Sequence, residues 1–187
     1  MHLILGSQSP RRRSLLAGLD IPFEAISIDA DEWFPANLTE GDIPLYISRE
    51  KAQAYLPRLH TDELLITADT IVWFNGRMFG KPHSLEEAKQ MLYSLSGHTH
   101  QVYTGITLTT AGSQESFVDC TDVTFRTLAD TEIDYYVEHY RPLDKAGAYG
   151  VQEYIGYIGV RKMAGSYFNV MGFPIDRVYL ALQKYGF

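Results

Sequence analysis

A polar loop near the N-terminus carries the first residues that could do chemistry, Ser7 and Ser9, followed by three consecutive arginines. The apolar stretch His2–Gly6 predicts a strand before this loop. A helix should begin near Ser9, because serine is a favoured N-cap and Pro10 suits the first helical position. The free N–H groups of a helix start attract anions, and guanidinium groups bind phosphate oxygens in pairs. The loop is therefore a candidate phosphate site, with arginines that point into water or pair with acids as the alternative.

Asp69 is the second candidate, because it follows the apolar run 64–68 and stands just before Ile71. A carboxylate buried there would be costly unless it were paired or bound to a metal. A strand end holds a catalytic acid or base on a rigid scaffold, whereas the alternative is an aspartate that caps a turn through backbone N–H groups. Lys51 and Lys81 are candidate cationic partners, although lysines are more often solvated.

Other reactive groups give weaker signals. The glycine-spaced segment 144–150 lets backbone approach a ligand closely, but it lacks the Gly-Lys-Ser/Thr ending of a P-loop. His98 and His100 could face one metal from a strand, yet no carboxylate stands at a helpful spacing. Cys120 has no basic neighbour and the chain has no Gly-x-Ser-x-Gly elbow, so we expect no covalent catalysis.

The elements that must position these residues mix strands and helices without a strict βαβ alternation. The run 64–68 predicts a buried strand that is interrupted at Asp69, and Asn75-Gly76 predicts a two-residue hairpin. Helices are predicted over 44–55, from Ser84, over 130–140 and over 174–184, with long β-rich stretches over 101–109 and 116–126. This pattern predicts an α/β or α+β fold with a mixed, partly antiparallel sheet flanked by helices.

The composition limits the classes of partner. With 187 residues, 45% of them apolar and 21% charged, the chain is expected to be globular, as one domain or two closely packed lobes. The net charge of −7 argues against non-specific binding to a nucleic acid polymer or an anionic membrane. We expect no targeting or membrane-spanning segment, and the single cysteine fits a reducing compartment. The sequence thus predicts a cytoplasmic protein with no nucleic acid or membrane partner.

Taken together and in this order, the segments resemble the Maf family of nucleoside triphosphate pyrophosphatases. The resemblance spans essentially the whole chain and rests on Ser7-x-Ser9-Pro10-Arg11-Arg12, Glu32, Arg49-Glu50-Lys51-Ala52, Ala68-Asp69-Thr70, Gly80-Lys81-Pro82, Ser96-Gly97, Val102-Tyr103-Thr104-Gly105, Asp144–Gly150 with Gln152, Gly165-Ser166-Tyr167 and Gly172-Phe173-Pro174. It implies one Maf-like domain over residues 1–187, with the two-lobed α/β fold of inosine triphosphate pyrophosphatases and a central active cleft. It also implies a homodimer and a divalent cation, Mg²⁺ or Mn²⁺, as cofactor.

The resemblance further implies roles for single residues. Asp69 matches the family's proton acceptor: it would activate a water for in-line attack on the α-phosphorus of a nucleoside triphosphate, which releases pyrophosphate and leaves the monophosphate. Glu32 and Asp69 would serve the metal. Phosphate binding would fall to Ser7, Ser9, Arg12, Lys51 and Lys81.

Three positions indicate the subfamily by the same resemblance. Arg11, Thr70 and Gln152 match the residues of the group that acts on dTTP and UTP. A neutral glutamine can offer both a donor and an acceptor to a pyrimidine edge. The alternatives are the 7-methyl-GTP branch, which carries a bulky aromatic, Gln and Glu at these positions, and a nucleotide-binding regulator of cell division without catalysis. Thr67, where the family usually has Gly, is the departure nearest the expected base.

Overall fold

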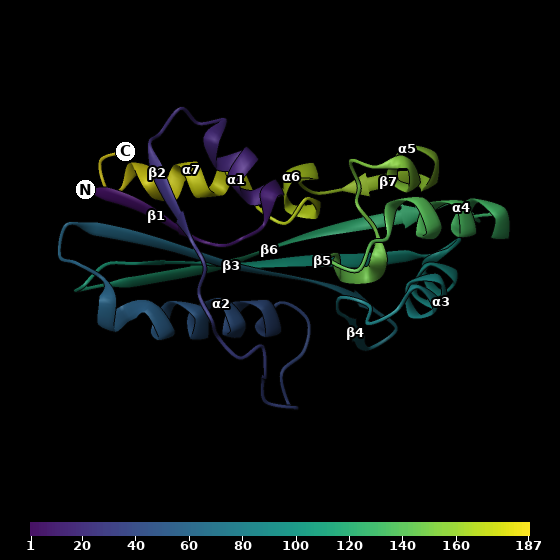
Figure 1. Cartoon of the computed structure of the whole chain (residues 1–187), viewed down its shortest axis with the longest axis horizontal. Helices are drawn as coiled ribbons and strands as arrows, with labels where there is room; N and C mark the ends of the chain where they lie inside the picture. Colours follow the sequence, from purple (N-terminus) through teal and green to yellow (C-terminus); the bar gives the residue numbers. More distant parts are fainter. The chain divides into compact units, whose positions relative to one another are not determined.

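Seven strands form one mixed sheet in the computed structural model, which describes residues 1–187 (Figure 1). The strands are β1 (His2–Gly6), β2 (Phe23–Ile26), β3 (Glu63–Phe74), β4 (Arg77–Phe79), β5 (Thr99–Thr109), β6 (Gln114–Phe125) and β7 (Val160–Ala164). Their order is β2-β1-β3-β5-β6-β7, and β4 pairs with β3. Strand β1 runs parallel to β2 and β3, whereas the β3–β4 and β6–β7 pairs are antiparallel. The mixed, partly antiparallel sheet predicted from the sequence is confirmed.

Helices and short 3-10 turns connect the strands. They are α1 (Pro10–Ala17), α2 (Asp42–Tyr55), η1 (Leu56–Arg58), α3 (Leu85–Leu95), α4 (Asp130–Tyr140), η2 (Ala146–Ala148), α5 (Tyr154–Gly159), α6 (Tyr167–Val170) and α7 (Ile175–Gln183). Ser9 and Ser84 cap α1 and α3, each accepting a hydrogen bond from a backbone N–H three residues further on. None of the helices combines the length and the apolar character needed to cross a bilayer.

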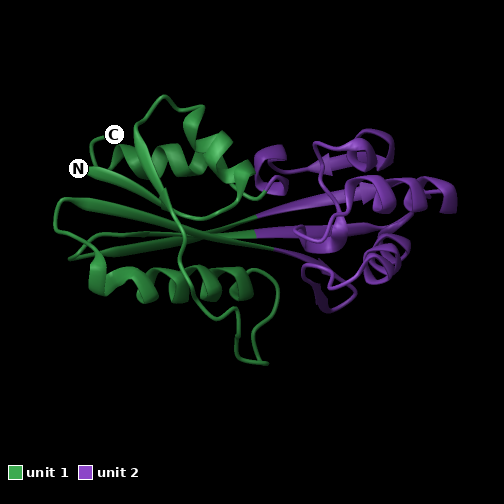
Figure 2. Ribbon diagram, viewed as in Figure 1, with its two compact units in different colours: residues 1–70, 104–119, 172–187 green, residues 71–103, 120–171 purple.

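The chain divides into two compact units (Figure 2). Unit 1 comprises Met1–Thr70, Thr104–Asp119 and Gly172–Phe187, and unit 2 comprises Ile71–Tyr103 and Cys120–Met171. Strands β3, β5 and β6 contribute residues to both units. Each unit has its own hydrophobic core.

In unit 1 the strands β1 and β3 present alternate side chains to two layers of helices. Ile66 joins a core cluster with Leu16 of α1 and Val178 of α7, whereas Leu65 packs with Ala52 of α2. Because successive side chains of a strand point to opposite faces, α1 and α7 cover one face of this part of the sheet and α2 covers the other (Figure 1).

In unit 2 the helices α3, α4 and α5 enclose a second core. Leu92 of α3, Tyr136 of α4 and Ile155 of α5 are fully buried in one cluster. The hairpin predicted at Asn75-Gly76 joins β3 to β4. The two turn residues have φ angles of 50° and 75°, the left-handed conformation that asparagine and glycine tolerate best in a tight hairpin turn.

The strand that carries Asp69 is longer than the sequence predicted. β3 does not break at Asp69 but continues through Ile71 and Val72 to Phe74. The apolar and β-branched residues after the carboxylate still favour an extended strand, which explains the difference. The sequence pattern also missed α5, β7 and α6, which have six, five and four residues and are too short to show a period.

Candidate active site

Lys51 contacts both carboxylates that were predicted from the sequence, those of Glu32 and Asp69. Its Nζ atom lies 2.8 Å from Asp69 Oδ1 and 3.2 Å from Glu32 Oε1. The side chains of Lys51 and Asp69 are only 13% and 12% exposed, whereas that of Glu32 is 53% exposed. Opposite charges attract one another more strongly where water is largely excluded, so Lys51 and Asp69 hold each other in place. One cation and two carboxylates thus meet at a single point of unit 1.

The period of β3 explains how Asp69 reaches Lys51. Residues two apart on a strand share a face, and the preceding residue on the face of Asp69 is Thr67. Thr67 Oγ1 donates a 2.7 Å hydrogen bond to the carbonyl oxygen of Ser48 in α2. Lys51 lies three residues after Ser48, on the same side of that helix, and its side chain extends to Asp69.

The two carboxylates also fit a hard divalent cation. Mg²⁺ is commonly held by one or two carboxylates and fills its other positions with water and substrate phosphates. Glu32 and Asp69 supply such a pair, because both already surround one positive charge. No group of three or more His, Cys, Asp or Glu side chains is placed to hold a metal ion. Water and phosphate oxygens would therefore have to complete the coordination.

The loop between β1 and α1 is stabilised by its own side chains. Ser9 Oγ accepts a hydrogen bond from the backbone N–H of Arg12 at 3.5 Å, and Ser7 Oγ accepts one from the Ser9 N–H at 3.2 Å. Arg13 donates to the side chain of Gln8 at 2.7 Å. The first turn of α1 has no acidic residue, so the positive end of the helix keeps its attraction for an anion.

Arg12 joins this loop to both neighbours of Asp69. Its Nη1 donates to the Ala68 carbonyl at 3.0 Å, its Nη2 to Thr70 Oγ1 at 3.0 Å, and its Nε to the Gly172 carbonyl at 2.9 Å. Burial lowers the pKa of the Arg12 guanidinium from its ordinary value, and the negative charge of Asp69 opposes that shift. These contacts are with the protein itself, so the phosphate-binding role of Arg12 stays a prediction.

Most of the predicted site residues lie in unit 1. Thr70 Oγ1 is 3.0 Å from Thr104 Oγ1, and Arg11 follows the proline in the first turn of α1. The structure thus places the carboxylates, Lys51, the serines and the arginines of the prediction in one unit. Lys81, which is exposed after β4, and Gln152, which is half-buried before α5, belong to unit 2.

The sequence reasoning missed a set of polar groups beneath the carboxylates. Ser48 Oγ lies 2.8 Å from Thr107 Oγ1, and Thr67 donates to the Ser48 carbonyl. All three residues are fully buried, where a hydroxyl without a partner would cost about 1–3 kcal/mol. The signal that could have revealed them is Thr67 itself, since it replaces the glycine expected from the family resemblance.

The chain is similar to a known protein family over almost its whole length. A family model described as "Maf-like protein" matches residues 2–185. The chain is 56% identical over 183 residues to a protein of Phocaeicola vulgatus named "dTTP/UTP pyrophosphatase", which covers 97% of this chain and 95% of the relative.

Two further relatives carry the same name. The Bacteroides thetaiotaomicron protein is 54% identical, with 98% of this chain and 95% of the relative covered, and the Porphyromonas gingivalis protein is 49% identical, with 98% and 94% covered. Among solved structures, the Staphylococcus aureus Ham1 protein matches with a TM-score of 0.46 and 16% identity, covering 70% of this chain and 73% of that one. That likeness is too distant to bear on function.

Proposed function

The chain belongs to the Maf family, and from this premise we propose that it hydrolyses dTTP and UTP to the nucleoside monophosphate and pyrophosphate. The observation that carries the proposal is that Lys51 Nζ lies within 3.2 Å of a carboxylate oxygen of both Asp69 and Glu32. Arg12, at the start of α1, bonds to both neighbours of Asp69. The relatives named dTTP/UTP pyrophosphatase support the choice of substrate, because they are 49–56% identical over nearly the whole chain.

Asp69 is the proposed general base. Its carboxylate accepts the proton of a water, which attacks the α-phosphorus in line and displaces pyrophosphate. Lys51 holds one oxygen of Asp69 at 2.8 Å and so fixes the direction of the carboxylate before substrate binds. The reaction needs no covalent intermediate, because water itself is the nucleophile.

The triphosphate is proposed to bind at the loop and at two lysines. Ser7, Ser9 and the N–H groups at the start of α1 offer donors to phosphate oxygens, together with Arg12. Lys51 and Lys81 would neutralise phosphate charge. A divalent cation, Mg²⁺ or Mn²⁺, held by Glu32 and Asp69, would supply Lewis-acid stabilisation of the charge that develops on the phosphates.

Substrate choice is proposed to depend on Arg11, Thr70 and Gln152. The amide of Gln152 can both donate to and accept from a pyrimidine edge, whereas a carboxylate at this position would suit a cationic methylated guanine. The 7-methyl-GTP branch is therefore less favoured. A nucleotide-binding regulator of cell division without catalysis is less favoured as well, because mere binding does not require the carboxylates around Lys51.

The remaining properties are proposed from the family resemblance and the composition. We infer a single Maf-like domain with an active cleft, a homodimer as the assembled form and the cytoplasm as the location. The net charge of −7 supports the absence of a nucleic acid or membrane partner.

The first test measures pyrophosphate release from dTTP, UTP, CTP, GTP and 7-methyl-GTP with Mg²⁺ or Mn²⁺. We expect dTTP and UTP to be preferred, and hydrolysis in ¹⁸O-labelled water to place the label in the monophosphate.

Asp69→Asn should lower turnover by about 10²–10⁴-fold, the usual contribution of a general base. Asp62→Asn, at an exposed aspartate just before the same strand, is the matched control and should keep normal turnover. Normal turnover in Asp69→Asn would contradict the assigned base.

A further inference from the structure

A tight turn in unit 2 carries Gln152. The backbone N–H of Glu153 donates to the carbonyl of Gly150 at 3.1 Å, which closes the turn around Gln152. Gln152 is half-buried and lies two residues after Gly150. Whatever fixes the two ends of this turn therefore fixes the position of Gln152.

One hydroxyl group binds both ends of the turn. Tyr136 of α4 is fully buried, and its hydroxyl oxygen accepts a 3.0 Å hydrogen bond from the N–H of Gly150. The same hydroxyl donates to Oε2 of Glu153 at 2.5 Å. Burial and the Glu153 carboxylate raise the pKa of Tyr136, so the hydroxyl keeps the proton that it donates.

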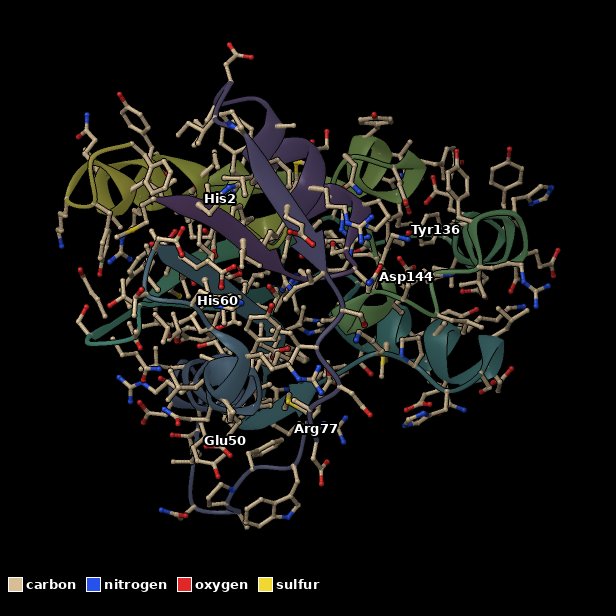
Figure 3. The ribbon with its side chains drawn as sticks, turned by 60° about the vertical axis from the view of Figure 1, so that its left-hand side comes forward. His2, Glu50, His60, Arg77, Tyr136 and Asp144 are labelled. Carbon is tan, nitrogen blue, oxygen red and sulfur yellow. The ribbon has the colours of Figure 1, made fainter.

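Lys145 fixes the other oxygen of the same carboxylate. Its Nζ lies 3.2 Å from Glu153 Oε1 and 2.7 Å from Asp144 Oδ1, and the lysine is only 8% exposed (Tyr136 and Asp144 are labelled in Figure 3). The carboxylate sits against Gly150 itself: a Cβ atom there would come within 2.7 Å of Glu153 Cδ. Only glycine leaves room for this arrangement.

The network places a buried lysine and a largely buried carboxylate at a turn that apolar side chains could also stabilise. Taking charged groups out of water costs several kcal/mol per ion, and apolar residues of the same volume often stabilise a fold as well or better. A buried lysine, a carboxylate and a tyrosine that converge on one short turn do, however, give that turn a single geometry. An amide side chain recognises a base only when it is held in one orientation, because its donor and its acceptor must both face their partners.

We propose that Tyr136 and Glu153 are positioning residues for nucleotide specificity. The Tyr136 hydroxyl and the Glu153 carboxylate hold the turn 150–153 in the one conformation that presents the Gln152 amide to the pyrimidine base. This inference rests on the proposed function, since it assumes that Gln152 reads the base. The loop that carries Lys145 also contacts the residue before Lys81, because the N–H of Gly147 donates to the carbonyl of Gly80 at 3.1 Å.

The test compares Tyr136→Phe with Tyr140→Phe, since both tyrosines lie on α4 and their rings stack with centroids 5.0 Å apart. Tyr140 is 42% exposed, so its hydroxyl is not part of the buried network. For each protein, kcat/KM is measured with dTTP, UTP and CTP, alongside urea unfolding. Tyr136→Phe should lower the ratio of kcat/KM for dTTP over CTP about tenfold, because the turn loses the hydroxyl that binds both of its ends and the Gln152 amide is no longer held in one orientation. Tyr140→Phe should leave the ratio unchanged.

A second variant guards against a simple folding defect. Glu153→Gln keeps the shape and an acceptor for Tyr136 but removes the charge beside Lys145, and it should lower the same ratio. Unchanged ratios in both variants, or equal losses on all three nucleotides, would overturn the positioning role while leaving the proposed function intact. A wild-type protein that releases no pyrophosphate from dTTP or UTP would overturn the proposed function, and this inference with it.

Discussion

Arg12 shows how one residue can organise the site through its contacts with the protein itself. Its guanidinium donates to Ala68 and Thr70, which flank Asp69, and to the carbonyl of Gly172. A planar guanidinium can satisfy three acceptors in fixed directions, which the single ammonium of a lysine cannot. At the scale of the residue, therefore, the shape of the Arg12 guanidinium lets one side chain hold both neighbours of Asp69.

Arg12→Lys should destabilise the fold and disturb the base. Without the guanidinium, at least one buried carbonyl of Ala68 or Gly172 loses its donor, at about 1–3 kcal/mol for each. We expect urea unfolding to show a loss of about 2–4 kcal/mol in the free energy of unfolding, together with reduced turnover. Arg13→Lys is the matched control, because Arg13 bonds mainly to the exposed side chain of Gln8 and should change stability by less than about 0.5 kcal/mol. Equal losses in the two variants would refute the special role of Arg12.

The residue types at the site could be predicted, but not their partners. The sequence predicts site residues where the neighbouring residues are informative. Examples are the serines that precede a proline and three arginines, and the aspartate that follows an apolar run. The bond from Arg12 to Gly172 spans 160 positions of the chain, and no local pattern encodes it. For Lys51 and Asp69 the sequence predicted both residues as candidates for the site. Their 2.8 Å contact could not be predicted, because it depends on how the chain folds.

At the scale of the element, the site depends on how α2 is aligned with β3. Thr67 of β3 donates to the Ser48 carbonyl of α2, and Ser48 Oγ lies 2.8 Å from Thr107 of β5. These buried hydroxyls fix the helix along the strand three residues before Lys51 and two before Asp69. A helix that packed only through apolar side chains could slide more easily, because the hydrophobic effect has no preferred direction.

Thr67→Val should lower turnover more than a comparable change elsewhere in the sheet. Valine keeps the volume but loses the bond to Ser48, so the alignment of Lys51 with Asp69 should loosen and kcat should fall about threefold to tenfold. The control is Thr109→Val in β5, which is 1% exposed and loses a bond from Gln114. Both variants should lose about 1 kcal/mol of stability, measured by urea unfolding. A fall of kcat in both, or in neither, would show that the Thr67 hydroxyl does not set this alignment.

The elements themselves were predictable where a period or a cap was strong. The helix from Ser84, the hairpin at Asn75-Gly76 and the helix over 130–140 all appear as expected, because capping, turn chemistry and a 3.6-residue period act within a few residues. The predicted interruption at Asp69 was wrong, because β3 runs through this residue as one strand from Glu63 to Phe74. The pairing with Lys51 offsets the cost of holding a largely buried carboxylate inside the strand.

At the scale of the whole molecule, stability in acid should depend on one buried histidine. His100 is fully buried, and its Nε2 lies 2.8 Å from the hydroxyl of Tyr149. Its Nδ1 has no hydrogen-bond partner, so a proton there would be buried without an acceptor. Burial lowers the pKa of His100 from 6.5 to about 4, and the charge of Asp122 opposes this shift. The folded protein thus keeps this imidazole neutral in mild acid.

Acidification should therefore favour unfolding through His100. The unfolded chain binds a proton near pH 6.5 and the folded protein only near pH 4, so between these values the unfolded state holds more protons and stability falls as the pH falls. Between pH 7 and pH 5 this group should remove about 2 kcal/mol from the free energy of unfolding. The variant His100→Gln can still bond to Tyr149 but cannot take up a proton. Between pH 7 and pH 5, its free energy of unfolding in urea titrations should therefore fall by about 2 kcal/mol less than that of the wild type. His83→Gln, at an exposed histidine, should follow the wild type. If His100→Gln also follows the wild type, the imidazole is not the group that makes the protein sensitive to acid.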